Sequence, residues 1–349
     1  MFCSRFFHLL ALLPLVLAHK EPKTDQEIET QRALQRAAYY CAPAVADFTA
    51  ARKRKWAQKV LNVNPGLPGY DDLFADANYI DAGESTELME CSPVSRKTAI
   101  QNNTCVLTPV VTEGPYYHTE GHPIRTNIAE YQFGLLTYLD IGVIDVNTCK
   151  PLPNVLVDIW QANATGHYAG HPFPKPELKD EKPQVGGKRS GLLSAFPRTE
   201  FDETWLRGAF PTDENGVVQF TTIFPGYYTG RATHVHVKIF KSWEPLPNGT
   251  FSSPEGSLAH VGQFFFEDEL NLQIDKMWPY HTNPIKDTHG RTRNWRDSLN
   301  IFEDSHSPEG QYNPVFKMEL LGPVITQGLA GFITMGINAS ASYDNWWKG

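Results

Sequence analysis

The 349-residue sequence is poor in basic residues, in long apolar runs and in cysteine. Lys and Arg total 31 against 39 for Asp and Glu, which gives a formal net charge of -8. An acidic chain binds nucleic acid and anionic membranes weakly, so we expect neither as a partner. The sequence has no internal repeat and no low-complexity stretch, and its polar last residues, 343–349, do not match a lipid-anchor signal.

One apolar run stands near the start of the chain, at residues 6–18, directly after Arg5. A membrane-spanning helix needs about 20 apolar residues, and this run is shorter and is interrupted by Pro14. A basic residue, a short apolar core and a small residue at Ala18 are typical of a secretory signal. The pattern predicts a signal peptide over residues 1–18 and a secreted, extracellular protein.

Cysteine occurs five times, and Cys3 falls inside the predicted signal peptide. The other four are an even number, which fits two disulfides in an oxidising compartment. Four cysteines allow three pairings, and the sequence does not choose among them. Proximity along the chain favours Cys105–Cys149 and Cys41–Cys91.

Four Asn-x-Ser/Thr sequons are glycosylation candidates if the chain is secreted. They begin at Asn102, Asn163, Asn248 and Asn338. Asn163 lies in a turn in which its side chain has a structural use, because asparagine commonly hydrogen-bonds the turn backbone. We therefore expect glycans at Asn102, Asn248 and Asn338, and lower occupancy at Asn163.

The first part of the predicted mature chain, residues 19–100, is interpreted as an N-terminal arm. Residues 24–27 form a capping-box sequence, and a helix-compatible run continues from there to about residue 62. Residues 63–100 are interpreted as extended and irregular. The basic run at 52–55 is interpreted as a solvated helix face. The helical arm also offers a surface for a homodimer.

Residues 101–349 form the predicted catalytic domain. Short strand-like segments are separated by Pro, Gly and Asn turns with no alternating helices. This organisation predicts a mainly β fold, an antiparallel β-sandwich core with an N-terminal helical arm and long loops. The predicted strands are 135–146, 155–160, 216–224, 234–240 and 261–266, and the Pro- and Gly-rich stretch 169–207 is a predicted pocket wall or lid.

The sequence His234-Val235-His236 places two imidazoles on one face of a strand, because strand side chains alternate with period 2. Tyr168 and Tyr228 add two phenols, and a phenolate is a hard anionic donor that suits ferric iron. Taken alone, a His-x-His pair is more often a solvated strand face, and a lone tyrosine is more often half-buried core. Their combination with Arg231 favours a metal site.

Nine short motifs resemble, in order, those of the intradiol ring-cleavage dioxygenases, closest to the secreted fungal-type branch. These enzymes are non-haem ferric proteins that open catechols between the two hydroxyls. The similarity covers roughly residues 105–270, and the arm and the tail carry little of it. The motifs lie at 112–117, 157–163, 166–168, 207–208, 212–213, 225–228, 230–231, 234–236 and 262–266.

The resemblance implies Fe(III) as cofactor, catechols and O2 as substrates, and cis,cis-muconate-type products. Its implied iron ligands are Tyr168, Tyr228, His234 and His236, with Tyr228 leaving when substrate binds. Tyr228 rather than Tyr227 corresponds to the fourth residue of the family's Pro-Gly-x-Tyr. The other implied site residues are Arg231, which stabilises charge on the substrate, Gln263, which faces the reacting ring, and Thr112 and Pro115, which line the pocket.

Two other functions stay open at this point. Cleavage after Ala18 makes His19 the first residue, and an N-terminal histidine chelates copper through its amine and ring, as in secreted copper monooxygenases. A catalytically inactive secreted β-sandwich that serves in binding is the second alternative. The intact set of ligand residues, with Arg231 and Gln263, favours the ferric dioxygenase over both.

Overall fold

The computed structural model describes residues 24–60, 111, 113–171, 200, 202–299, 301, 306–307, 310–311 and 313–343. The predicted signal peptide, the extended stretch 63–100 and most of the predicted lid lie outside these residues. So do His19, Cys91, Asn102, Cys105 and Thr112. Within the described part of the chain, no helix combines the length and the apolar character that crossing a bilayer requires.

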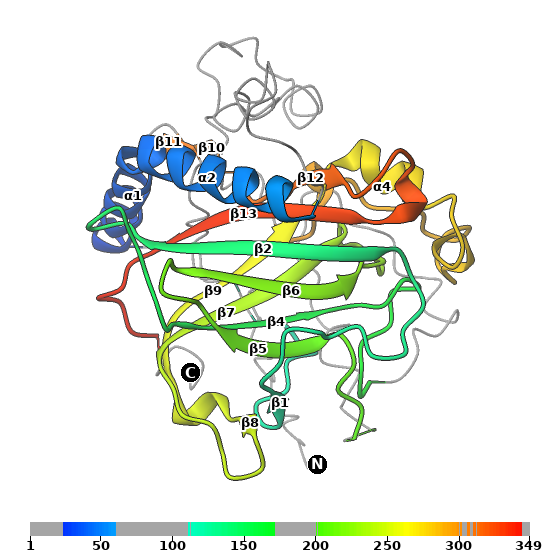
Figure 1. Ribbon diagram of the computed structural model, residues 1–349, viewed down its shortest axis with the longest axis horizontal. Helices are drawn as coiled ribbons and strands as arrows, with labels where there is room; N and C mark the ends of the chain where they lie inside the picture. The colour runs from blue at the N-terminus through cyan, green and yellow to red at the C-terminus, as the bar shows by residue number, and fades with distance from the viewer. Residues whose placement is uncertain are drawn as a thin grey trace, which may run out of the picture.

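Two β-sheets packed face to face form the body of the molecule (Figure 1). One sheet has the order β12-β13-β2-β3, with β6 on β2, and the other has the order β5-β4-β7-β9. The bounds are β2 Leu136–Asp145, β3 Lys150–Pro151, β4 Leu156–Gln161, β5 Arg207–Pro211, β6 Val217–Ile223, β7 His234–Ser242, β9 Ser257–Phe265, β12 Lys317–Leu320 and β13 Leu329–Ile337. The mainly β sandwich and its five predicted strands are confirmed.

The prediction of an antiparallel sandwich needs one correction. β13 runs parallel to β2 along its whole length, from Leu329 opposite Thr137 to Ile337 opposite Asp145. Every other named strand pair is antiparallel among the described residues. A parallel pair requires a long connection, and here almost the whole catalytic domain separates the two strands.

Short elements complete the described structure. β1 His122–Pro123 pairs with β8 Thr250–Phe251, and β10 His306–Ser307 pairs with β11 Gly310–Gln311. The helix α4 Asp268–Ile274 follows β9 directly. Four short 3-10 segments are η4 Ser253–Glu255, η5 Tyr280–Thr282, η6 Asn294–Arg296 and η7 Ile325–Gln327.

Alternation along each strand decides which side chains fill the core. On β7, Val235, Val237 and Ile239 point between the sheets and belong to the main apolar cluster. The intervening residues, beginning with His234 and His236, therefore point to the opposite face of this sheet. The hydrophobic pattern of β7 thus places the two histidines outside the core, on the outer face of the β5-β4-β7-β9 sheet.

Two helices lie across the outer face of the other sheet (Figure 1). They are α1 Asp25–Tyr40 and α2 Ala42–Val60, which confirms the predicted helical run. Trp56 of α2 packs edge-on against Phe332 of β13, with ring centroids 5.3 Å apart, and the Thr49 and Thr334 hydroxyls lie 2.7 Å apart. The described part of the arm is therefore packed on the sandwich.

The interpretation of the basic run as a solvated helix face is wrong for its first two residues. Arg52 is 8% exposed, and its guanidinium lies 3.3 Å from the carboxylate of Asp140 and donates to Ile333 O at 2.9 Å. Lys53 is 5% exposed and lies 2.5 Å from the Glu319 carboxylate. The acidic partners, Asp140 and Glu319, lie far from the basic run along the chain. The sequence of the run therefore does not reveal that a sheet with acidic side chains packs against it.

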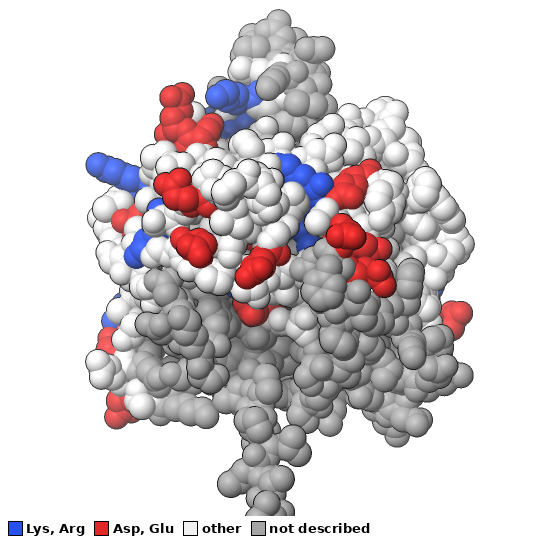
Figure 2. Space-filling model, turned by 90° about the horizontal axis from the view of Figure 1, so that it is seen from below, with Lys and Arg blue, Asp and Glu red and all other residues white. Residues whose placement is uncertain are grey.

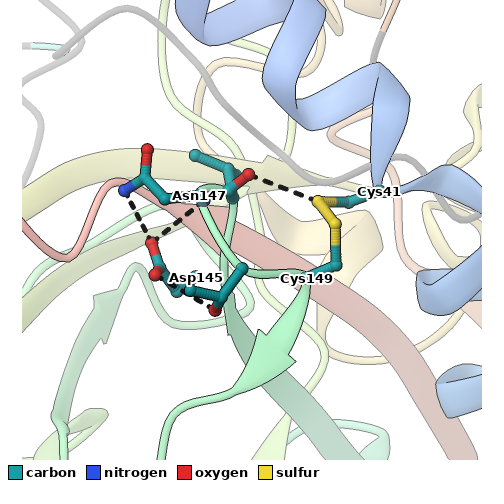
Figure 3. Close-up of a disulfide and its surroundings, with 6 residues drawn as sticks. Cys41, Asp145, Asn147 and Cys149 are labelled. Carbon is teal, nitrogen blue, oxygen red and sulfur yellow. Dashed lines mark hydrogen bonds between the residues drawn. A yellow bond between two sulfur atoms is a disulfide. The ribbon is translucent and has the colours of Figure 1, made fainter.

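The disulfide pairing favoured by proximity is also wrong. Cys41, at the junction of α1 and α2, is bonded to Cys149, in the turn after β2 (Figure 3). The two Cα atoms are 5.2 Å apart although 108 residues separate them in the chain. Val45 and Val146 pack beside the bridge in one apolar cluster. Packing of the helices on the sheet brings the two cysteines together, and chain distance does not reflect that packing.

Removing this bridge is expected to cost stability and to leave the predicted metal site intact. A cross-link over so long a loop constrains the unfolded chain, and losing a native disulfide typically costs about 2–5 kcal/mol. We expect a loss of that size for Cys41→Ser/Cys149→Ser in guanidinium unfolding, with an unchanged visible spectrum of the folded protein. Peptide mapping that links Cys41 to Cys91 would contradict this account.

Candidate metal centre

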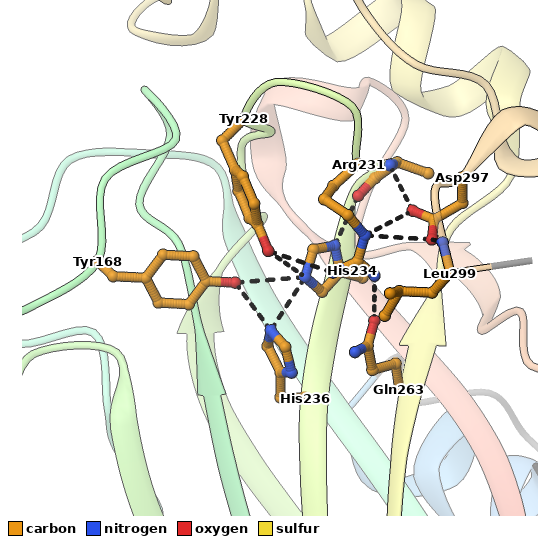
Figure 4. Close-up of polar contacts among 9 residues, drawn as sticks. Tyr168, Tyr228, Arg231, His234, His236, Gln263, Asp297 and Leu299 are labelled. Carbon is orange, nitrogen blue, oxygen red and sulfur yellow. Dashed lines mark hydrogen bonds and ion pairs between the residues drawn. The ribbon is translucent and has the colours of Figure 1, made fainter. Parts of the chain in front are cut away.

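Four predicted ligand side chains converge on the outer face of the β5-β4-β7-β9 sheet (Figure 4). His234 and His236 come from β7, two residues apart on one face. Tyr168 and Tyr228 come from two loops that follow β4 and β6. All four are buried, with exposed fractions of 8% or less.

Close backbone packing holds the two tyrosine loops against each other. Gly226 donates its amide to Asn163 O at 3.0 Å, and a Cβ on Gly226 would lie 2.5 Å from that same oxygen. Gly166, at a φ of +85°, faces Tyr227 O so closely that a Cβ would lie 2.2 Å away. Only glycine fits at both positions, and this fixes Tyr168 relative to Tyr228.

The four donor atoms are spaced as ligands around a common point. His234 Nε2 lies 3.0 Å from His236 Nε2, 3.3 Å from Tyr168 Oη and 3.4 Å from Tyr228 Oη. His236 Nε2 lies 3.1 Å from Tyr168 Oη. Metal–nitrogen bonds of about 2.0–2.1 Å separate neighbouring ligand atoms by about 3 Å, so this spacing fits a shared ion.

Both imidazoles are neutral. Burial lowers the pKa of His234 and of His236 well below the usual range, and the nearby charge of Arg231 adds to the effect. His234 Nδ1 lies 2.6 Å from Ala232 O, so it carries the proton and leaves the Nε2 lone pair directed at the other donors. This is the tautomer that binds a metal through Nε2.

Both phenols are protonated when nothing else acts on them. Burial raises the pKa of Tyr168 well above its ordinary value, and it also raises the pKa of Tyr228, where Arg231 partly offsets the effect. A cation of high charge between the phenol oxygens reverses this preference, as bound metals do for their ligands. Two neutral imidazoles and two ionisable phenols match the donor preference of ferric iron.

The four converging residues fit a ferric ion. They do not form a site of the more common kind, in which His, Cys, Asp and Glu side chains supply all the metal ligands. Within the ranges that the structure describes, no group of three or more His, Cys, Asp or Glu side chains is arranged to hold a metal. A metal bound by His234 and His236 therefore takes its remaining ligands from the phenols. That requirement argues against zinc and for a hard trivalent ion.

Arg231 is buried beside the donors and is hydrogen-bonded along its whole guanidinium (Figure 4). Its Nη1 donates to Tyr228 Oη at 3.2 Å, and its Nη2 donates to Gln263 Oε1. Its Nε donates to both carboxylate oxygens of Asp297, at 3.1 and 3.0 Å. Burial alone lowers the pKa of Arg231, but Asp297 together with Tyr228 and Tyr168 more than offsets this, and the pKa is raised overall.

Gln263 lies opposite His236 on the neighbouring strand β9 and is fully buried. Because its Oε1 accepts from Arg231, its Nε2 is the free end of the amide. That nitrogen has no hydrogen-bond partner among the described residues. A buried donor without a partner costs free energy unless a bound group completes it, which marks this as a ligand-facing position.

Comparison with known proteins places the chain in a family. No protein-family model and no curated protein matches the sequence. An intradiol ring-cleavage dioxygenase from Tetranychus urticae is 31% identical, over 68% of this chain and 97% of that one, with a TM-score of 0.48. The chain belongs to the intradiol ring-cleavage dioxygenases. The match extends beyond the stretch 105–270 from which the resemblance was recognised.

Two further structures are similar to this intradiol dioxygenase. A crystal structure of another dioxygenase is 30% identical, over 68% of this chain and 96% of that one, with a TM-score of 0.46. The dioxygenase domain of a fusion with a carbohydrate-binding protein, from the cellulolytic bacterium Streptomyces sp. SirexAA-E, is 23% identical. That match covers 67% of this chain and 99% of that one, with a TM-score of 0.37.

Aromatic rings pack against the four predicted ligand residues of this intradiol family member. Trp160 of β4 stacks on His236, with centroids 4.7 Å apart and planes 10° apart. Tyr116 stacks on Tyr168 at 4.4 Å and meets Tyr228 edge-on at 5.7 Å. Tyr116 therefore packs against both phenols, and Pro115, a predicted pocket residue, directly precedes it.

Asp297 and the bracing role of Trp160 were not foreseen. Trp160 lies in a motif of the resemblance, and its register opposite His236 is the signal that identifies it. Asp297 lies in the tail, beyond that resemblance, and only the tertiary fold brings it to Arg231. Thr112 lies outside the described residues, so its predicted pocket role stays a prediction.

The hydrogen bonds of Asn163 agree with the expected use of its side chain. Its Oδ1 accepts from the amides of Thr165 and His167, both at 3.0 Å, and its Nδ2 donates to Gln132 at 3.1 Å. The nitrogen that would carry a glycan is therefore already engaged. Asn248 is exposed. Lower glycan occupancy at Asn163 remains a prediction.

Proposed function

We propose that this intradiol family member is an extracellular Fe(III)-dependent dioxygenase that cleaves catechol-type diols with O2 to cis,cis-muconate-type products. The observation that carries the proposal is the convergence of Tyr168, Tyr228, His234 and His236, with donor atoms 3.0–3.4 Å apart. These four residues are the proposed iron ligands. When bound, ferric iron supplies the charge that ionises phenol ligands and catechol hydroxyls and the electronic coupling that lets a catechol react with O2.

Tyr228 and Arg231 have separate roles in the proposed proton transfer: Tyr228 accepts a proton and Arg231 donates a hydrogen bond. Tyr228 is the proposed ligand that yields its place, and its Oη then takes a proton from a catechol hydroxyl. Arg231 Nη1, 3.2 Å from Tyr228 Oη, donates to whichever oxygen carries negative charge there. Such a fixed donor in a buried site stabilises developing charge more strongly than water does.

Gln263 and the two histidines have positioning roles in the proposal. The free Nε2 of Gln263 donates to a substrate oxygen, while Arg231 fixes the orientation of the amide through Oε1. His234 is held by its bond to Ala232 O, and His236 by its stack on Trp160. The sheet β5-β4-β7-β9 therefore presents substrate with a fixed half of the site, and the side chain of Tyr228, on a loop whose backbone is held, supplies the part that changes.

The described structure does not favour either alternative function, the copper monooxygenase or the non-catalytic binding protein. The copper alternative depends on His19, which lies outside the described residues. It also leaves unexplained why two phenols and two neutral imidazoles share one buried point. A binding protein without catalysis does not need a buried Arg231 directed at Tyr228. The intact set of charged and ionisable groups therefore supports catalysis.

The proposed setting is extracellular, with small molecules as partners. The Cys41–Cys149 bridge supports an oxidising compartment. In Figure 2, acidic side chains are spread over the described part of one face, with basic ones between them. A homodimer through the helical arm remains a prediction.

Oxygen uptake with a panel of catechols tests the proposal. Iron-loaded protein is expected to consume one O2 per catechol and to yield a cis,cis-muconate-type diacid, and the His236→Ala variant is expected to do neither. The panel contains catechol, a methylcatechol, hydroxyquinol and protocatechuate. Cleavage of a ring bond other than the one between the two hydroxyl-bearing carbons would contradict the proposal. So would the absence of oxygen uptake with every catechol of the panel, if the protein contains one iron per chain.

A further inference from the structure

A carboxylate from the tail of the chain holds the arginine of the site. Asp297 follows η6 and has a fully buried side chain. It accepts from Arg231 Nε through both oxygens, and from the amides of Ala232 at 2.8 Å and Leu299 at 3.1 Å. A carboxylate that accepts from this many N–H donors is held in a fixed orientation.

This contact decides which edge of the guanidinium faces the reaction. With Nε engaged by Asp297, the two terminal nitrogens point to Tyr228 Oη and Gln263 Oε1 (Figure 4). A planar guanidinium has a fixed fork of donors, so anchoring one edge orients the others. The tail is further tied to this loop by Ser298, which donates its amide to Gly230 O at 3.1 Å.

The same contact cancels a charge. Arg231 and Asp297 form a buried pair that is neutral overall, with side chains 4% and 0% exposed. With Tyr228 displaced and protonated, the charge of the proposed ferric ion would be balanced by the Tyr168 phenolate and by the two oxygens of a bound catechol. An additional anionic substituent on the catechol therefore gains little from Arg231, whose charge Asp297 already neutralises. In a buried site, a negative charge without a counter-charge is costly.

We infer that Asp297 is a positioning residue that aims Arg231 at Tyr228 and Gln263 and, by neutralising it, makes the site prefer catechols without an anionic substituent. The inference rests on the proposed function, because it concerns the substrate class of the same site. It assigns a role to the tail, to which the sequence motifs gave none.

A matched pair of ligands isolates the charge effect. 3,4-Dihydroxybenzamide and 3,4-dihydroxybenzoate differ in charge and little in shape, and their dissociation constants are measured without oxygen from the change in the visible spectrum. The wild-type protein is expected to bind the benzamide more tightly. Asp297→Asn is expected to shift the ratio of the two constants about tenfold toward the benzoate, equivalent to about 1.4 kcal/mol.

Two control variants separate this role from a structural one. Asp268→Asn removes another buried carboxylate, which accepts from the Asn294 amide and has no hydrogen bond to Arg231. The ratio of the two dissociation constants in this variant is expected to match wild type. Asp297→Glu keeps the charge and is expected to keep the preference for the benzamide. Asp297→Asn is also expected to shift the tyrosinate-to-iron band, because Nη1 is no longer held against Tyr228.

Each outcome is decisive. A wild-type protein that binds the benzoate more tightly would overturn the inference, whether or not any variant folds. A ratio that moves less than twofold in Asp297→Asn, with iron retained, would also overturn it. Failure of the wild-type iron protein to bind either ligand would instead contradict the proposed function itself.

Discussion

Replacing both Tyr168 and Tyr228 by phenylalanine is expected to bleach the ferric protein. The colour is expected to arise from charge transfer between tyrosinate and iron, and the double variant has no phenolate to supply it. Each single variant is expected to keep iron and to shift the band. The measurement is the visible spectrum together with the iron content of each purified protein.

Tyr227→Phe provides the matched control for this experiment. Tyr227 precedes Tyr228 on the same loop and is buried, but its ring packs under Arg291, with the guanidinium carbon 4.3 Å from the centroid. Its variant is therefore expected to keep the wild-type spectrum. His234→Ala and His236→Ala are expected to lose iron. Wild-type colour in the double tyrosine variant would exclude these phenols as ligands.

Arg231→Ala is expected to lower kcat by about 10²–10³ while the protein retains iron. Removing one fixed donor to a developing negative charge in a buried site typically has an effect of this size. Arg231 contacts Tyr228 Oη but is not among the four converging donors, so metal content is expected to stay near one per chain. Steady-state kinetics and iron analysis on the same preparation make the measurement.

The stability of this variant is a separate matter. Without Arg231, the carboxylate of Asp297 is buried and unpaired, which typically costs about 3–5 kcal/mol. The double variant Arg231→Ala/Asp297→Ala removes both charges, so it is expected to recover much of that loss and none of the activity. Recovery of activity in the double variant would mean that Arg231 acts only as a structural partner of Asp297.

The fold could be predicted from the sequence wherever local patterning determines it. β7 alternates apolar core residues with His234 and His236, so one pattern predicted both a strand and a metal face. The strand β13 was not foreseen, because its parallel pairing with β2 joins segments that lie far apart in the chain. Local alternation identifies strands, but it does not show which distant strands pair.

The errors share one physical cause. Arg52 was expected in solvent and is buried against Asp140, and Cys41 was paired with Cys91 and is bonded to Cys149. In both cases the arm packs on a sheet formed from residues more than 80 positions later in the chain. Sequence proximity predicts such contacts poorly, because packing of amphipathic elements, not chain distance, decides them.

In the candidate site, too, local motifs could be predicted from the sequence and tertiary contacts could not. Residues inside short motifs, such as the His234-x-His236 pair, could be placed by type and spacing. Asp297 could not, because a lone aspartate in a tail carries no pattern, and its role depends on a tertiary contact with Arg231. The orienting groups around a site therefore need the fold, even where the donor atoms can be proposed from the sequence.

Metal analysis with a visible spectrum of the purified protein tests the central claim most directly. The account predicts one ferric ion per chain and a red-brown colour from tyrosinate charge transfer, which changes when a catechol is added without oxygen. A blue copper protein, a colourless zinc protein, or a folded protein that takes up no iron when ferric salt is supplied would contradict it.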